Sequence, residues 1–280
     1  MYLSYFGFNE LPFGITPDTQ FAFAGNGHQE ALNTLLVALK SGEGFIKITG
    51  EVGTGKTLLC RRFLAALGKE YVSAYLPNPY LAPNTLFMAV LEELGTPYQP
   101  QEYEFNLLKT VNKLLLDFAR KRKVVVLCID EAQAMPLETL EALRLLSNLE
   151  TEKRKLLHLV LFGQPELDAK LADPSVRQLR QRIAFHYRLT ALKRDELHPY
   201  LGHRLRVAGY RGEGLFAPAA VRLIHYASRG TPRLVNILAH KALLSVFGEG
   251  RMQVTARHVR TAARDTEEAR LPWWLTAGIL

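Results

Sequence analysis

The segment "GEVGTGKT", residues 50–57, restricts the fold of this chain more than any other stretch. It matches the pattern G-x-x-x-x-G-K-[ST], follows the apolar run 44–50 and precedes a helix-like segment that begins "TLLCRRFL". Glycines let the backbone curl so that its N–H groups converge on phosphate oxygens, and the helix N-terminus adds partial positive charge. A chance glycine-rich turn is the alternative, but the flanking strand and helix favour a phosphate-binding loop.

The side chains of this loop predict a nucleotide site. We expect Lys56 to reach the β- and γ-phosphates of ATP, and the Thr57 hydroxyl to bind Mg²⁺. The residues expected to bind the nucleotide are Gly50, Glu51, Val52, Gly53, Thr54, Gly55, Lys56, Thr57 and Leu58.

A second motif, "VVVLCIDEAQ", ends a strand-like run in two carboxylates. We expect Asp130 to bind Mg²⁺ beside Thr57, directly or through water. Glu131 is placed to act as the general base for the attacking water. The alternative is that both acids only cap the following helix. With the phosphate-binding loop upstream, ATP hydrolysis is the leading prediction.

The order of apolar runs predicts an α/β domain. Segments with helical periodicity separate the runs, which favours a parallel sheet covered by helices on both faces. The valine-rich run lacks alternation, as expected of a central strand buried on both sides. The five runs are "GFIKITG" (44–50), "YVSAYL" (71–76), "VVVLCID" (124–130), "LHLVLFG" (157–163) and "IAFHYRL" (183–189).

After Leu192 the strand-like runs stop, and a small all-α lid domain is expected. We therefore predict a three-layer P-loop NTPase domain over residues 1–191, a helical lid over 192–267 and an apolar tail over 268–280. The lid helices are expected at 193–206, 217–228, 233–247 and 255–265.

Composition limits the cellular setting. The 35 basic and 27 acidic residues give a net charge of +8, which is compatible with nucleic acid, anionic lipid or nucleotide and selects none of them. Cys60 and Cys128 lie in apolar segments and are expected to be reduced core residues. We expect no signal peptide, because the start has no basic n-region and no long apolar stretch, and no run approaches the length of a membrane span. We expect a cytoplasmic location, with the inner-membrane surface as an alternative because the tail contains Trp273 and Trp274.

Eight stretches, one of them the loop itself, form a recognisable set. They are "YFGFNELPFGITPD", "HQEAL", "IDEAQ", "LRLLSNLET", "LFGQPEL", "LRQRI", "GTPRLVN" and the loop's own "GEVGTGKT". Together they resemble the AAA+ ATPases, and more narrowly the group that contains general secretion pathway protein A (ExeA) and the MSHA pilus biogenesis ATPase (MshM). ExeA-type proteins continue past the lid into a membrane span and a periplasmic region, so we expect this chain to be of the shorter type.

The resemblance implies roles for further residues. Gln164 matches a polar sensor of the γ-phosphate or attacking water, although it could instead cap the helix that follows. Arg233 in "GTPR" matches the lid's sensor arginine, with a solvated residue early in a helix as the alternative. Asn78 is expected to hydrogen-bond Glu131 until a partner binds, or to be an ordinary turn residue between prolines. The N-terminal segment 1–42 resembles the part that packs over adenine.

The stretch "SVRQLRQRI" places several arginines ahead of the last strand-like run. At this position AAA+ proteins face the neighbouring subunit, so the resemblance implies that Arg182 completes the neighbour's site, with Arg180 as second candidate. Guanidinium suits this task because its planar fork meets phosphate oxygens bidentately and stays charged. A DNA contact or a solvated face are the alternatives.

The expected function is an oligomerising ATPase that assists assembly of a pilus or a type II secretion machine. Its expected partners are other copies of the chain and pilus or secretion-assembly proteins. The alternative is a DNA-dependent AAA+ ATPase of the transposition-helper or initiator kind, which the basic clusters 120–123 and 152–155 support weakly. A nucleotide-regulated scaffold is the third possibility.

Overall fold

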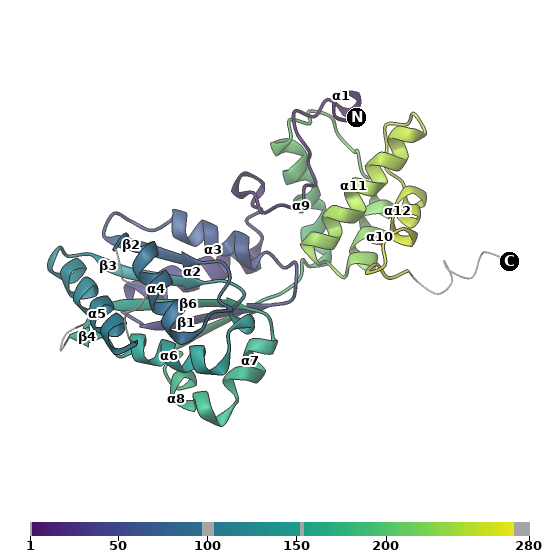
Figure 1. The fold of residues 1–280 in the computed structure, drawn as a ribbon. Coiled ribbons are helices and arrows are strands. Elements are labelled where there is room, and N and C mark those ends of the chain that lie inside the picture. The colour runs from purple at the N-terminus through teal and green to yellow at the C-terminus, as the bar shows by residue number, and fades with distance from the viewer. Residues whose placement is uncertain (1, 97–103, 152–153, 272–280) are drawn as a thin grey trace. The chain divides into compact units, whose positions relative to one another are not determined.

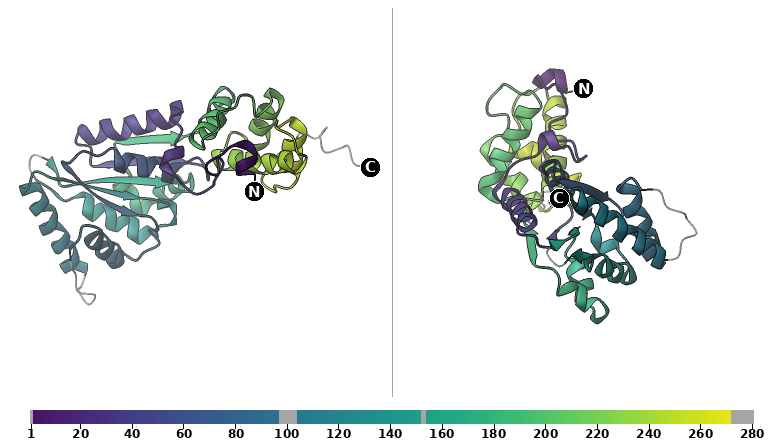
Figure 2. Two further views of the ribbon diagram at one scale, coloured as in Figure 1. Left: turned by 90° about the horizontal axis from the view of Figure 1, so that it is seen from above. Right: turned by 90° about the vertical axis from the view of Figure 1, so that its left-hand side faces the viewer.

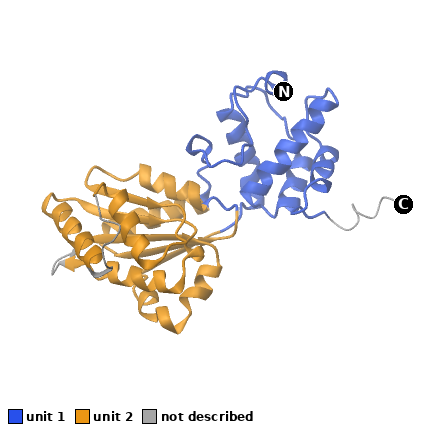
Figure 3. Cartoon of the chain, viewed as in Figure 1, with its two compact units in different colours: residues 1–26, 53–55, 190–280 blue, residues 27–52, 56–189 orange. Residues whose placement is uncertain are grey.

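The computed structural model describes residues 2–96, 104–151 and 154–271. They form two compact units, coloured separately in Figure 3. The α/β unit contains residues 27–52 and 56–189. The helical unit contains residues 1–26, 53–55 and 190–280.

A five-stranded sheet forms the centre of the α/β unit (Figure 1). All neighbouring strands are parallel, and their order is β2-β3-β6-β1-β7. This arrangement confirms the predicted parallel sheet. The last strand starts two residues later than expected, because the Ile183 N–H donates to Arg180 O and extends the preceding turn. The strands are β1 (Phe45–Gly50), β2 (Tyr71–Leu76), β3 (Val124–Ile129), β6 (Leu157–Gly163) and β7 (Phe185–Leu189).

Successive residues of β3 enter two different hydrophobic cores. Val125 and Leu127 pack in the core shared with α4, α5 and α6, whereas Val126 and Cys128 pack in the core shared with α2 and α3. Side chains of a strand alternate between faces, so the continuous apolar run covers both. Cys60 lies in the second core, and both cysteines are free and buried as predicted. The helices are α2 (Asn26–Lys40), α3 (Lys56–Ala65), α4 (Pro83–Glu93), α5 (Glu104–Arg120), α6 (Leu137–Ser147), α7 (Glu166–Leu171) and α8 (Arg177–Arg180).

Figure 2 shows helices on both faces of this sheet, which makes the unit three-layered. A small antiparallel pair, β4 (Glu150–Thr151) with β5 (Arg154–Lys155), lies between α6 and β6. Because β3, β6 and β1 are adjacent and parallel, their carboxyl ends meet at one edge of the sheet. Open α/β sheets bind ligands at this edge.

The helical unit contains the four helices expected for the lid. No predicted end of these helices is more than one residue from the observed end. They are α9 (Arg194–Val207), α10 (Pro218–Ser228), α11 (Pro232–Gly248) and α12 (Ala256–Arg264).

The N-terminal segment differs from its expected assignment to the nucleotide-binding domain, because residues 1–26 group with the helical unit. Its aromatic residues Tyr2, Phe6 and Phe13 are buried in the same core as α9–α12. Arg204 of α9, only 7% exposed, fastens the segment by donating from Nε to Pro12 O (2.6 Å) and from Nη2 to Gly14 O (3.1 Å). Its guanidinium also lies 4.8 Å from the centre of the Phe21 ring.

None of the helices within the described ranges is both long and apolar enough to cross a membrane. The expectation that the tail with Trp273 and Trp274 lies at the inner-membrane surface concerns positions outside the described residues.

Candidate nucleotide site

The loop between β1 and α3 follows the predicted strand–loop–helix order. β1 ends at Gly50 and α3 begins at Lys56. Gly53 and Gly55 adopt φ values of 76° and 94°, which glycine reaches without the steric cost of a Cβ atom. These values give the backbone the curl that the phosphate-binding interpretation requires.

Lys56 is the buried cation of this loop, with 5% of its surface exposed. Its Nζ donates to Gly50 O at 2.8 Å and to Glu51 O at 3.1 Å. Burial lowers the pKa of Lys56, and the negative charges of Glu131 and Asp130 oppose that shift. The ammonium therefore lies among carbonyl oxygens and carboxylates, where an incoming phosphate would be a better-matched partner.

Thr57 and Asp130 meet across the ends of α3 and β3. The Thr57 Oγ1 donates to Asp130 Oδ2 at 2.6 Å, and the Tyr75 hydroxyl donates to the same oxygen at 3.4 Å. Burial and the charge of Asp130 raise the pKa of Tyr75, so this hydroxyl keeps its proton. The hydroxyl and carboxylate oxygens are the ligands that Mg²⁺ prefers, so the residues present fit this ion.

Glu131 follows Asp130 in a left-handed backbone conformation with φ of 50°. A residue with a Cβ pays about 1 kcal/mol or more for this region. The Asp130 Oδ1 accepts the Glu131 N–H at 2.9 Å and supports the turn. The Glu131 Oε2 accepts from Gln133 Nε2 at 2.6 Å and from Gln164 Nε2 at 3.1 Å.

Gln164 lies directly after β6, and its side chain points to Glu131. It makes no side-chain cap on α7, whose N-cap residue is Pro165. Asn78 is not bonded to Glu131: its Oδ1 accepts the Tyr80 N–H at 3.3 Å, which is the local turn expected of asparagine. The amides on Glu131 thus come from Gln133 and Gln164 instead.

The predicted arginines lie in three places. Arg233 is the second residue of α11, and its N–H donates to Gly53 O (3.2 Å) within the helical unit. Arg180 ends α8 and is exposed. Arg182, also exposed, donates from Nη1 to Ser147 O at 3.2 Å.

Two residues of this site, Gln133 and Tyr75, were missed by sequence reasoning. Gln133 belongs to the "IDEAQ" stretch, so its place two residues after Glu131 was the available signal. Tyr75 pairs in register with Cys128, two residues before Asp130, but this pairing follows from the strand order and not from a motif.

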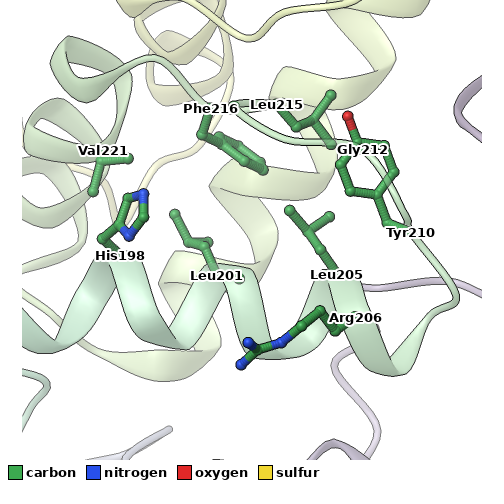
Figure 4. Close-up of a pocket in the computed structure, with 11 residues that line it drawn as sticks. His198, Leu201, Leu205, Arg206, Tyr210, Gly212, Leu215, Phe216 and Val221 are labelled. Carbon is green, nitrogen blue, oxygen red and sulfur yellow. The ribbon is translucent and has the colours of Figure 1, made fainter.

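A separate cavity of about 190 Å³ lies within the helical unit between α9, the loop after it and α10 (Figure 4). Leu201, Leu205 and Phe216 give it apolar walls, and His198 and Arg206 add polar groups. None of the residues predicted for the nucleotide site lines it.

Comparison with known proteins finds a matching domain family and a relative in sequence. A family model described as an AAA domain matches residues 39–171. General secretion pathway protein A of Aeromonas hydrophila is 39% identical over 273 residues, which cover 96% of this chain and 49% of that protein. The chain therefore spans about half the length of the curated relative it matches.

Solved structures share the fold at low sequence identity. Cdc6p from Pyrobaculum aerophilum has a TM-score of 0.71 and 17% identity, covering 94% of this chain and 74% of that one. The RuvB Holliday junction branch migration motor of Thermotoga maritima has a TM-score of 0.59 and 18% identity, covering 89% and 73%. The chain thus carries an AAA domain in the α/β P-loop fold of the AAA+ ATPases and is related in sequence to General secretion pathway protein A.

Proposed function

We propose that this chain binds ATP with Mg²⁺ at the carboxyl ends of β1 and β3 and hydrolyses the bond between the β- and γ-phosphates. The observation that supports this most strongly is the contact of Thr57 Oγ1 with Asp130 Oδ2 at 2.6 Å, with buried Lys56 beside it. A cation, a hydroxyl and a carboxylate converge at the end of a glycine-rich loop, which is the combination that phosphoryl transfer from a nucleotide needs.

In the proposed reaction, Lys56 exchanges its bonds with Gly50 O and Glu51 O for phosphate oxygens. The loop N–H groups and the start of α3 bind the remaining phosphate charge. Thr57 and Asp130 would hold Mg²⁺, which when bound neutralises charge on the phosphates. Glu131 accepts a proton from the attacking water, and Gln164 orients that water or the γ-phosphate.

The proposed active form is an oligomer. Arg182 is the proposed arginine finger for a neighbouring subunit, with Arg180 as the second candidate. Both are exposed, and Arg182 is engaged only by a backbone carbonyl in the bonds described, so its guanidinium can exchange that bond for phosphate oxygens. Arg233 is the proposed sensor of the nucleotide from the helical unit.

The proposed cellular role is assistance in building a type II secretion machine or a type IV-like pilus such as the MSHA pilus, in the cytoplasm or at the inner-membrane surface. The sequence relation to General secretion pathway protein A supports the secretion part of this role. The partners would be further copies of the chain and components of that machine.

Steady-state ATP hydrolysis tests this proposal. The purified chain is assayed alone, with anionic lipid vesicles, with candidate secretion or pilus components, and with double-stranded DNA. We expect Mg²⁺-dependent turnover that rises with a secretion or pilus component. Turnover that rises only with DNA would favour the DNA-dependent alternative, and absence of turnover in every arm would refute ATP hydrolysis.

A further inference from the structure

Gln133 links three parts of the site through one side chain. It lies in the short 3-10 turn Ala132–Ala134 that follows β3. Its Nε2 donates to Glu131 Oε2 at 2.6 Å, and its Oε1 accepts the backbone N–H of Gln164 at 2.9 Å. The Gln164 Nε2 completes the ring by donating to the same Glu131 oxygen at 3.1 Å.

Hydrogen-bond chemistry fixes the orientation of this amide. A backbone N–H can only donate, so the Gln133 atom facing Gln164 N must be the oxygen. The opposite atom is then the nitrogen, and it donates to the Glu131 carboxylate oxygen. Rotating the amide by 180° would place donor against donor and acceptor against acceptor. Gln133 is therefore an oriented bridge between the end of β6 and Glu131.

The surrounding backbone supports the bridge. Gly163, the last residue of β6, has no side chain at the point where the turn approaches: a Cβ there would lie 2.7 Å from Leu167 Cδ2 and 3.4 Å from Gln133 Oε1. On the other side, the left-handed conformation of Glu131, supported by Asp130 Oδ1, directs its carboxylate to the two amides.

We propose that Gln133 is a positioning residue that fixes the Glu131 carboxylate and couples it to Gln164. This inference rests on the proposed ATP hydrolysis. Both amides engage Oε2, and among the bonds of the described residues none engages Oε1. One carboxylate oxygen is thus fixed, and the other is available to the attacking water. If bound nucleotide shifts Gln164, the hydrogen bonds among Gln164, Gln133 and Glu131 transmit that shift to the Glu131 carboxylate.

The first arm of the test does not depend on hydrolysis. Selective ¹⁵N-glutamine labelling reports the exchange rate of the Gln164 backbone amide in the full chain. Gln133→Met preserves side-chain length but removes the acceptor, and should accelerate exchange about fivefold or more, since a net hydrogen bond is worth about 1 kcal/mol. Gln133→Glu keeps an acceptor oxygen and should leave the amide protected. Unchanged exchange in Gln133→Met would refute the bridge.

The second arm measures turnover and ATP affinity separately. Gln133→Met should lower kcat about 10–100-fold with ATP affinity within about twofold of wild type, because misplacement of a reacting group by about 1 Å costs that much. Gln133→Glu should also turn over poorly, since it places a second carboxylate against Glu131. A purely structural bridge would instead be rescued by this variant. Gln164→Met combined with Gln133→Met should lower kcat little more than either single change does, because the effects of residues that act as a unit are not additive.

Gln253→Leu is the matched control, because Gln253 is an exposed glutamine of the helical unit whose Nε2 donates to Gly214 O at 3.0 Å. It should retain wild-type kcat. If wild type turns over ATP and Gln133→Met does so at the same rate, the positioning role is refuted while the proposed function stands. If wild type hydrolyses no ATP under any condition, the proposed function fails. The positioning role of Gln133 in turnover then fails with it, even if hydrogen exchange confirms the bridge.

Discussion

Replacing Arg204 should release the N-terminal segment from the helical unit. The structure shows two charge-assisted bonds from this buried guanidinium, to Pro12 O and Gly14 O, and a ring contact with Phe21. Hydrogen bonds to a charged group contribute about 1.5–3 kcal/mol each. A cation–π contact adds about 0.5–1 kcal/mol. Because such terms overlap, Arg204→Ala should lower the free energy of opening of this segment by about 3–5 kcal/mol.

Hydrogen exchange followed by NMR measures this opening. The Asn9 amide is the reporter, since its N–H donates to Ala208 O at 2.8 Å between the segment and the end of α9. A loss of about 3–5 kcal/mol predicts exchange faster by about 10²–10³-fold or more. Arg204→Lys should give an Asn9 exchange rate between those of wild type and Arg204→Ala, because an ammonium lacks the planar fork that spans both carbonyls.

Arg206→Ala is the matched control. It lies on the same helix, two residues further, and is exposed. Surface substitutions of this kind change stability by about 0.5 kcal/mol or less. If Arg204→Ala accelerates Asn9 exchange less than about tenfold, or no more than Arg206→Ala does, the guanidinium does not fasten the segment and the reasoning is wrong.

Three further outcomes are expected. Lys56→Ala should abolish binding of a fluorescent ATP analogue, whereas Glu131→Gln should bind it and release no phosphate; equal loss of binding in both would make Glu131 structural. Arg182→Ala should bind ATP but hydrolyse it about 10³-fold more slowly, and mixing it with Lys56→Ala should restore part of the rate at mixed interfaces; a mixture as inactive as its components, although both assemble, would contradict action in trans. Burial lowers the pKa of His158, whose Nδ1 bonds to Glu43 O at 2.7 Å. The unfolded chain therefore binds this proton more readily, so its contribution to stability is complete above about pH 6.5 and is lost as the pH falls through and below that value. Urea unfolding of wild type and His158→Gln at pH 7.5 and 5.5 should show a smaller pH effect in the variant, and an identical effect would exclude His158 as the source.

The sheet was predictable because its strands carry a strong local signal. Val125 to Ile129 form an uninterrupted apolar run, and the structure buries that run on both faces. The short pair β4–β5 has no such signal, because two residues per strand bury little apolar surface.

The assignment of the N-terminal segment required knowledge of the fold. Its aromatic residues indicate burial, but a pattern of phenylalanine and tyrosine does not specify the surface against which they pack. The partner is decided by tertiary contacts such as Tyr2 Oη with His240 Nδ1 at 2.7 Å, across 238 positions of the chain.

At the candidate site, the sequence predicted the residues that a motif names and missed the contacts that depend on backbone direction. Lys56, Thr57, Asp130 and Glu131 were identified from two motifs and lie together. The bond expected between Asn78 and Glu131 does not form, because the asparagine closes its own turn. The role of Gln133 depends on the left-handed Glu131 and on the end of β6, neither of which periodicity reveals.

The grouping of residues 1–26 with residues 190–271 has a consequence for synthesis on the ribosome. The first segment emerges 164 residues before the first of its later partners. At about 5–20 residues per second, Phe6, Phe8 and Phe13 wait on the order of ten to thirty seconds without the core that buries them. The intervening unit, which holds the whole sheet, can complete itself in that interval. Nascent chains should therefore pass through a stage in which the sheet is folded and the aromatic residues of the N-terminal segment are exposed. Chaperones should bind this segment most readily at that stage.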